Sequence, residues 1–133
     1  MKTLHHAIKI AAPCAAVYRA LTTPEEMAVW HKGQVEGDIA PGRILTLTPK
    51  PGLRFGWRTD QLEPDRLIAQ TCVEGPGNSR DKTLTLTLSE PAPGVTQVTL
   101  ADGEWQEDDP HLPFCNSYWG AVLYRLKIHA EKK

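Results

Sequence analysis

The chain has 133 residues, of which 41% are apolar and 23% charged, and its formal net charge is −1. This length predicts a single domain, 1–133, and this composition supplies enough apolar surface for a core, which excludes a disordered chain. The charge does not favour nucleic acid or an anionic membrane as a partner, and no apolar run approaches the roughly 20 residues that span a bilayer. We therefore expect a cytoplasmic protein.

The N-terminal third predicts one strand followed by two short helices. Apolar and polar side chains alternate over residues 3–12, as in a half-buried strand. Pro13 suits the first turn of a helix, and an apolar stripe follows it. A second helix is predicted from Thr23, because Thr23 as N-cap with Glu26 three residues later is the capping-box pattern.

Six further strands are predicted between turns, four of which contain a Pro-Gly pair. In 83–89 leucine alternates with threonine, which is typical of a strand with one buried and one wet face. The short connections make these strands antiparallel neighbours. The predicted strands are 34–40, 43–48, 53–62, 67–73, 83–89 and 95–101.

The C-terminal segment 116–133 predicts a long helix, whose beginning is either Asp109-Pro110 or Pro113. Its apolar side chains recur at helical spacing and can be buried only against the apolar face of the sheet. This stripe consists of Cys115, Trp119, Val122, Leu123 and Leu126. The segment before it, 102–114, is acidic and predicts a solvated loop, with a lid or a docking surface around Trp105 as the alternative.

Four segments in this order resemble a known superfamily. AAPCAAVYRALTTPEEMAVWHKG (11–33) is similar to the N-terminal signature of the START/birch-pollen-allergen-like (SRPBCC) superfamily, and DQLEPDRLIAQT (60–71) to its central hairpin. TQVTL (96–100) resembles its penultimate strand, and the W-x-x-x-L-x-x-L-K pattern that begins at Trp119 resembles its C-terminal helix. The branch that looks most similar is the one named after activators of the heat-shock-protein ATPase.

The resemblance implies an α+β helix-grip fold. In this fold a seven-stranded antiparallel sheet wraps around a long C-terminal helix, two short helices follow the first strand, and a cavity lies between sheet and helix. Members include lipid carriers, hormone binders and polyketide cyclases, so the fold alone does not give the function. In this branch the residue before the helix tryptophan is often glycine, whereas here it is Tyr118.

We predict an apolar pocket near the start of the last helix, because the bulky residues cluster there and in the middle of 53–62. Two points stay open: Tyr118 either orients a ligand or plugs the space, and a bulge in 53–62 decides which of its faces points inward. The predicted lining is Phe55, Trp57, Leu86, Cys115, Tyr118 and Trp119.

The leading functional hypothesis is therefore binding of a small apolar or amphipathic organic molecule by a monomer or homodimer. The alternatives are an enzyme of the cyclase or hydrolase kind, using His31, Asp60 or His111, and a module that regulates a chaperone ATPase through protein contact. The sequence contains no motif for a metal, a nucleotide or a catalytic triad, so we expect no cofactor. Cys14, Cys72 and Cys115 are expected to be reduced and mostly buried.

Overall fold

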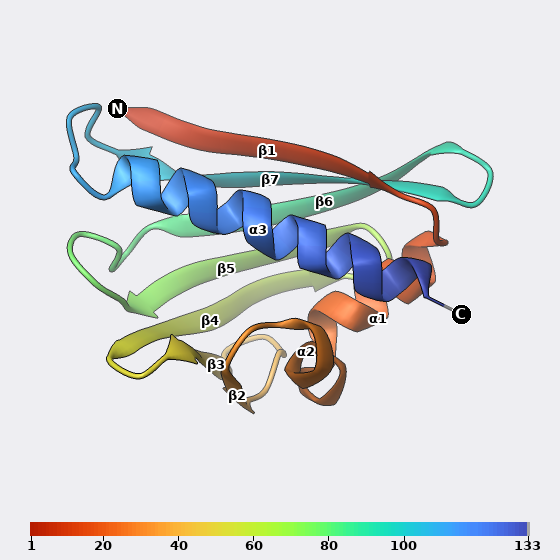
Figure 1. Cartoon of the computed structure of the whole chain (residues 1–133), viewed down its shortest axis with the longest axis horizontal. Coiled ribbons are helices and arrows are strands. Elements are labelled where there is room, and N and C mark those ends of the chain that lie inside the picture. Colours follow the sequence, from red (N-terminus) through yellow and green to blue (C-terminus); the bar gives the residue numbers. More distant parts are fainter. Residues whose placement is uncertain (133) are drawn as a thin grey trace.

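The computed structural model describes residues 1–132, so Lys133, at the end of the segment 116–133, lies outside the described range. Seven strands form one sheet, in which all neighbours are antiparallel and the order is β1-β7-β6-β5-β4-β3-β2. A long helix, α3, runs diagonally across one face of this sheet (Figure 1). The predicted α+β helix-grip architecture is confirmed. The strands are β1 (Lys2–Ile10), β2 (Gln34–Gly37), β3 (Ile44–Lys50), β4 (Leu53–Glu63), β5 (Leu67–Glu74), β6 (Thr83–Ala92) and β7 (Val95–Trp105).

Two short helices, α1 (Cys14–Thr22) and α2 (Pro24–Trp30), follow β1 as predicted. Thr23 is the N-cap of α2, but the predicted capping box is wrong, since the Thr23 side chain makes no cap hydrogen bond within the described range. Glu26 instead lies 2.9 Å from Nε2 of His129 and 3.5 Å from Nε of Arg19. The carboxylate that would have closed the first turn of α2 therefore connects α2 to the end of α3.

Helix α3 (Leu112–Glu131) begins one residue before Pro113, the second of the two predicted starting points. Proline is tolerated in a first helical turn because its missing N–H would have no partner there. The predicted apolar stripe is confirmed: Trp119, Val122, Leu123 and Leu126 are buried, and Cys115 is half-buried.

Strand β4 changes its pairing with β5 between Thr59 and Gln61. Before this bulge Trp57 and Thr59 are buried and Phe55 is half-buried. After it, Leu62 takes the inward position opposite Ile68. The bulge that the sequence left open is therefore present, and the aromatic residues of β4 face α3.

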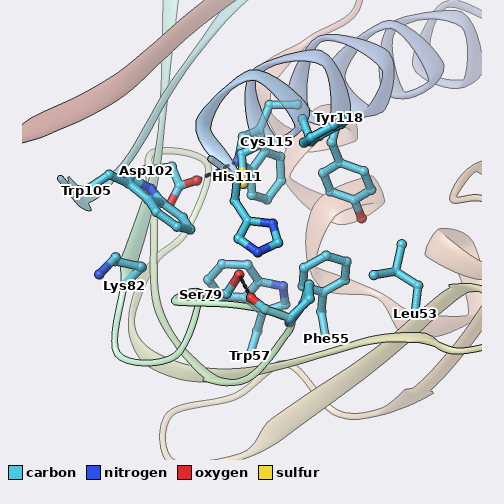
Figure 2. A pocket seen from close by; sticks show the side chains of 13 residues that line it. Leu53, Phe55, Trp57, Ser79, Lys82, Asp102, Trp105, His111, Cys115 and Tyr118 are labelled. Atoms are coloured by element: carbon cyan, nitrogen blue, oxygen red, sulfur yellow. Dashed lines mark hydrogen bonds between the residues drawn. The ribbon is translucent and has the colours of Figure 1, made fainter. Parts of the chain in front are cut away.

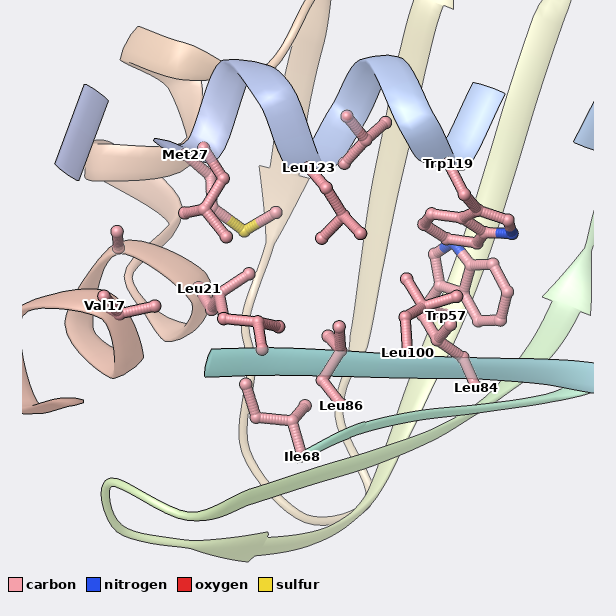
Figure 3. Packing of buried hydrophobic residues seen from close by; sticks show 14 of the residues in the cluster. Val17, Leu21, Met27, Trp57, Ile68, Leu84, Leu86, Leu100, Trp119 and Leu123 are labelled. Carbon is pink, nitrogen blue, oxygen red and sulfur yellow. The ribbon is translucent and has the colours of Figure 1, made fainter. Parts of the chain in front are cut away.

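The space between helix and sheet differs at its two ends. Toward the C-terminus of α3 it is closed, because α1 and α2 pack Leu21 and Met27 into the core between helix and sheet (Figure 3). Trp30 of α2 is buried in the same core. The Trp30 N–H also donates to the carbonyl of Ala20 at 3.0 Å, which joins the two helices. At the N-terminal end of α3 the β5–β6 loop and the loop before α3 take the place of the short helices (Figure 1). A cavity lies at this end.

Candidate functional site

A cavity of about 370 Å³ lies between the first turns of α3 and the sheet, a volume within the usual range for small-molecule sites. Its walls come from β4, β7, α3 and the β5–β6 loop, and most of the exposed wall is apolar (Figure 2). Phe114, which is 74% exposed, lies where the cavity meets solvent. The lining residues are Leu53, Phe55, Trp57, Pro76, Ser79, Lys82, Asp102, Trp105, His111, Phe114, Cys115, Tyr118 and Trp119.

Five of the six residues predicted to form the pocket come together around this cavity, and Leu86 is the exception. The rings of Trp57 and Trp119 lie 6.0 Å apart between their centroids and form the inner wall. Leu86 is buried behind them, where it borders a much smaller space of about 50 Å³. Leu86 therefore belongs to the packed core, since its place on β6 is further along the sheet than the cavity reaches.

Tyr118 stands at one side of the cavity and leaves its volume open. Its ring stacks on Phe55, with 5.4 Å between centroids, and its hydroxyl lies 3.2 Å from Nε2 of His31. Because Nδ1 of His31 faces the carbonyl of Lys32 at 2.9 Å, the proton of the neutral imidazole is on Nδ1. Tyr118 therefore donates its hydroxyl proton to His31.

Both partners of this hydrogen bond are kept neutral by burial. His31 is 7% exposed, and desolvation lowers its pKa, with a smaller contribution from the positive charge of Arg125, against the opposing effect of the Lys32 carbonyl. Burial likewise raises the pKa of the Tyr118 hydroxyl well above its ordinary value. His31, one of the acid–base candidates, thus orients Tyr118 and does not line the cavity itself.

The opposite side of the cavity holds a buried carboxyl group that sequence reasoning missed. Asp102 is 3% exposed, and its Oδ2 accepts a hydrogen bond from Nε1 of Trp119 at 2.8 Å. Burial raises the pKa of this carboxyl, while the indoles of Trp119 and Trp105 and the charge of Lys82 oppose that rise. The Lys82 ammonium lies 5.1 Å from the centroid of the Trp105 ring, a cation–π contact.

Asp102 is not identified from the sequence because the acidic segment 102–114 predicts a solvated loop. Strand β7 in fact continues to Trp105, and the docking surface considered around Trp105 is wrong, since this side chain is 2% exposed. The alternation of buried residues over Thr96, Val98 and Leu100 extends by one more step to Asp102. That period of two was the signal available in the sequence.

The cavity's entrance is formed by two loops that contact each other. Asn78, in the β5–β6 loop, donates to Oδ2 of Asp109 at 3.1 Å, and the other oxygen of Asp109 accepts the backbone N–H of His111 at 2.9 Å. The His111 imidazole packs directly on the backbone of Gly77, where a side chain would collide with it. The sequence thus places His111 correctly before the helix, and the structure adds that it lines the cavity.

Asp60, the third acid–base candidate, lies outside the cavity. It is exposed on β4, where it accepts hydrogen bonds from Thr71 at 2.6 Å and from Arg58 at 2.8 Å. The Thr71 hydrogen bond, and then Arg58, hold the pKa of this carboxyl below its ordinary value. An ionised, paired surface carboxylate of this kind cannot act on a molecule in the cavity.

The cysteines are free, with Cys72 buried and Cys14 and Cys115 half-buried. Burial raises the pKa of Cys72 and of Cys115 to about 11 each, so both are thiols near neutral pH and contribute apolar surface. Among residues 1–132 no three His, Cys, Asp or Glu side chains are placed to hold a metal ion. None of the helices in that range has both the length and the apolarity needed to cross a membrane.

The comparison with protein families agrees with this architecture. The family described as "Activator of Hsp90 ATPase homolog 1-like protein" matches residues 11–131, which is nearly the whole chain. The chain belongs to this family. Membership of the Hsp90 ATPase activator homologue family confirms the resemblance seen in the sequence, while no curated protein matches the chain.

Solved structures that match include two whose names refer to Hsp90 activators or Aha1, and others whose names do not. The Aha1 dimer from Colwellia psychrerythraea is 22% identical, with 98% of this chain and 97% of that chain covered and a TM-score of 0.88. An HSP90 activator from Plasmodium falciparum is 12% identical over 96% and 95% of the chains, with a TM-score of 0.80. CalU16 from Micromonospora echinospora is 22% identical over 96% and 75%, with a TM-score of 0.79. At these identities the likeness establishes the shared fold.

Proposed function

We propose that the chain binds a small, largely apolar organic molecule in the cavity at the start of α3. The observation that carries this proposal is the composition of the cavity wall: aromatic rings, including Trp57 and Trp119, surround about 370 Å³ and leave very few polar atoms facing it. Apolar surface that is not covered by other side chains favours an apolar occupant, because water gains little there.

Fluorescence titration with the neutral dye N-phenyl-1-naphthylamine tests this proposal. Wild-type protein is expected to bind the dye saturably and to shift its emission to the blue. Cys115→Phe is expected to weaken or abolish binding, because the added ring enters the cavity that Cys115 lines. Ala121→Phe makes a similar change on the exposed side of the same helix and is expected to leave binding unchanged. No saturable binding, or equal binding by both variants, would contradict the proposal.

A second candidate, acid–base catalysis in the same cavity, is favoured by one observation. Asp102 has a pKa raised mainly by burial and borders the same cavity as His111, and perturbed titratable groups in a cleft are typical of enzymes. The test is proton exchange at carbon: 2-tetralone incubated with the protein in D2O would incorporate deuterium next to its carbonyl. If exchange is no faster than in buffer alone, or is unchanged in Asp102→Asn, then Asp102 does not remove a proton from carbon.

The third candidate is regulation of a chaperone ATPase. It is supported by the family to which the chain belongs and by the printed name of the Plasmodium falciparum relative, an HSP90 activator. The measurement is the ATPase rate of an Hsp90 chaperone with and without the chain. An unchanged ATPase rate at a saturating concentration of the chain would contradict this third candidate and favour a function based on the cavity.

A further inference from the structure

Two polar atoms at one end of the cavity have no partner. Oδ1 of Asp102 and Nε1 of Trp105 are both buried, and neither makes a hydrogen bond with any group of residues 1–132. The two side chains are 3% and 2% exposed and both border the cavity. Buried polar atoms without partners are rare in folded proteins, and an unpaired one calls for an explanation. Figure 2 shows the two side chains next to each other at the edge of the cavity, and the Trp105 indole is near enough to the Asp102 carboxyl to oppose the rise in its pKa. The geometry between the two nevertheless falls short of a hydrogen bond, so each atom still lacks a partner.

The two unpaired atoms are complementary in their hydrogen-bonding capacity. Oδ1 of a carboxylate only accepts a hydrogen bond, and Nε1–H of an indole only donates one. A hydroxyl group does both: its proton can go to Asp102 while its oxygen accepts from Trp105. A carbonyl or ether oxygen could satisfy only Trp105, and a methyl group neither.

We propose that this pair of atoms recognises the hydroxyl group of a neutral phenol or alcohol whose apolar body fills the cavity. The inference rests on the ligand binding proposed above and names the ligand's polar group. Two other polar groups of the cavity wall already donate a hydrogen bond, the Tyr118 hydroxyl to His31 and the Ser79 hydroxyl to the carbonyl of Pro76. Asp102 and Trp105 are the lining side chains whose buried polar atoms have no partner among residues 1–132. Trp57, Phe55 and Tyr118 would then lie against the ligand's apolar body.

The charges around Asp102 favour a neutral hydroxyl over an ammonium or a carboxylate as the polar group of the ligand. The carboxylate of Asp102 already feels the positive charges of Lys82 and, more weakly, of His6. An ammonium group in the ligand would therefore meet a site whose negative charge is partly balanced, and would have to give up its own hydration. A ligand carboxylate would meet Asp102 across a poorly hydrated gap and be repelled. A neutral donor–acceptor group avoids both costs.

Three naphthalene probes of nearly equal size provide the test, each titrated by isothermal calorimetry into the full chain. 2-Naphthol offers the hydroxyl, 2-methylnaphthalene replaces it by a methyl group, and 2-(aminomethyl)naphthalene offers a cation. We expect 2-naphthol to bind at least about tenfold more tightly than either of the others, because hydrogen bonds to a charged, buried acceptor are among the stronger ones.

Two variants assign this preference to the two atoms. Trp105→Phe keeps an aromatic ring but removes the N–H, and Asp102→Asn keeps one oxygen for Trp119 but places an amide N–H₂ where the acceptor was. In each variant the preference for 2-naphthol over 2-methylnaphthalene is expected to shrink to within about threefold. Asp60→Asn makes the same chemical change on the outer face of β4 and is expected to keep the full preference. Circular dichroism shows whether each variant is folded. The preference of the wild-type protein among the three probes is measured independently of the variants, so it tests the inference even if a variant does not fold.

The outcomes separate this inference from the proposal on which it rests. If none of the probes binds, ligand binding in the cavity itself is wrong. If 2-naphthol and 2-methylnaphthalene bind equally well, the cavity binds ligands but the hydroxyl site does not exist, and an ordered water completes the pair. Preference for the amine would also overturn the inference, because Asp102 would then be selecting a cation. Preference for 2-naphthol that both variants reduce supports it.

Discussion

Nε1 of Trp119 on α3 donates a hydrogen bond to Oδ2 of Asp102 on β7 at 2.8 Å, and both side chains are buried. This bond joins the helix to the sheet at the point where the packed core gives way to the cavity. It also means that the largest side chain of the α3 stripe has a polar partner, so its packing and its hydrogen bond act together. The first prediction separates the two.

Trp119→Ala is expected to lower the free energy of unfolding by roughly 3–5 kcal/mol, because it removes a large buried side chain. Trp119→Phe keeps most of the apolar contact but leaves Oδ2 of Asp102 without its donor, and is expected to cost about 1–3 kcal/mol beyond the loss of area. Urea denaturation monitored by circular dichroism measures both. If Trp119→Phe were as stable as the wild type, the hydrogen bond would contribute nothing.

The contribution of Asp102 to stability is expected to fall as the pH rises past the ordinary pKa of an aspartate toward the raised folded pKa of this carboxyl. In that interval the folded state holds a proton that the unfolded state has released, so raising the pH favours unfolding. Asp102→Asn lacks this titration. Its stability relative to wild type is therefore expected to improve across the same interval, measured by urea denaturation at a series of pH values. A constant difference would show that burial does not raise this pKa.

His31 contributes with the opposite sign. Its folded pKa is lowered, mainly by burial, so below about pH 6.5 the unfolded chain takes up a proton that the folded chain does not. Stability is therefore expected to decrease as the pH falls from about 6.5 to the lowered pKa. The imidazole resonances of His31, followed by NMR, are expected to titrate below the ordinary histidine pKa of about 6.5. Titration of His31 at or above that value would contradict this prediction.

Gly77→Ala tests the contact between the two entrance loops. Gly77 has φ +58°, and an added Cβ would collide with the His111 imidazole. We expect this variant to lose about 1 kcal/mol or more of stability and to bind the dye differently, since His111 must move. Gly94→Ala is the control, because Gly94 also has a positive φ (+74°) but open space around the position of a Cβ. Equal effects of both substitutions on dye binding would show that His111 does not shape the cavity.

Glu26→Gln tests the connection between α2 and α3. Glu26 lies 2.9 Å from Nε2 of His129 and 3.5 Å from Nε of Arg19, and all three groups are partly exposed. We expect a loss of roughly 0.5–1 kcal/mol, the scale of a partly screened ion pair. Glu25→Gln changes the exposed neighbour in the same helical turn and is expected to have little effect. Denaturation midpoints for the two variants give the comparison.

The fold was predictable because its signals are local. Alternation in β6 and the Pro-Gly turns identify antiparallel strands, and the stripe ending at Leu126 identifies the face of α3 that meets them. Aromatic residues in the middle of β4 and at the start of α3 then give most of the cavity wall. Leu86 was misplaced because periodicity gives the face of a strand but not how far along it a cavity reaches.

The polar part of the site was not predictable in the same way. Nothing in the sequence states that Trp119 would direct its N–H to Asp102, because that contact depends on the angle at which α3 crosses β7. Glu26 shows the same limit: its local spacing fits a capping box, and a tertiary partner, His129, takes the carboxylate instead. Contacts between elements far apart in sequence decide both cases.

The closed and open ends of the space under α3 have a consequence for how this chain can change. Substitutions under α1 and α2 disturb the packed core and are expected to destabilise the fold. Substitutions in the loops and side chains at the start of α3 change the lining of the cavity, on which the packing of the rest of the core does not depend. Substitutions at the cavity end can therefore change which ligand is preferred, while the packed end under α1 and α2 maintains the fold. Directed evolution of a new ligand preference would best randomise Leu53, Pro76 and Phe114, which border the cavity and lie outside the buried core.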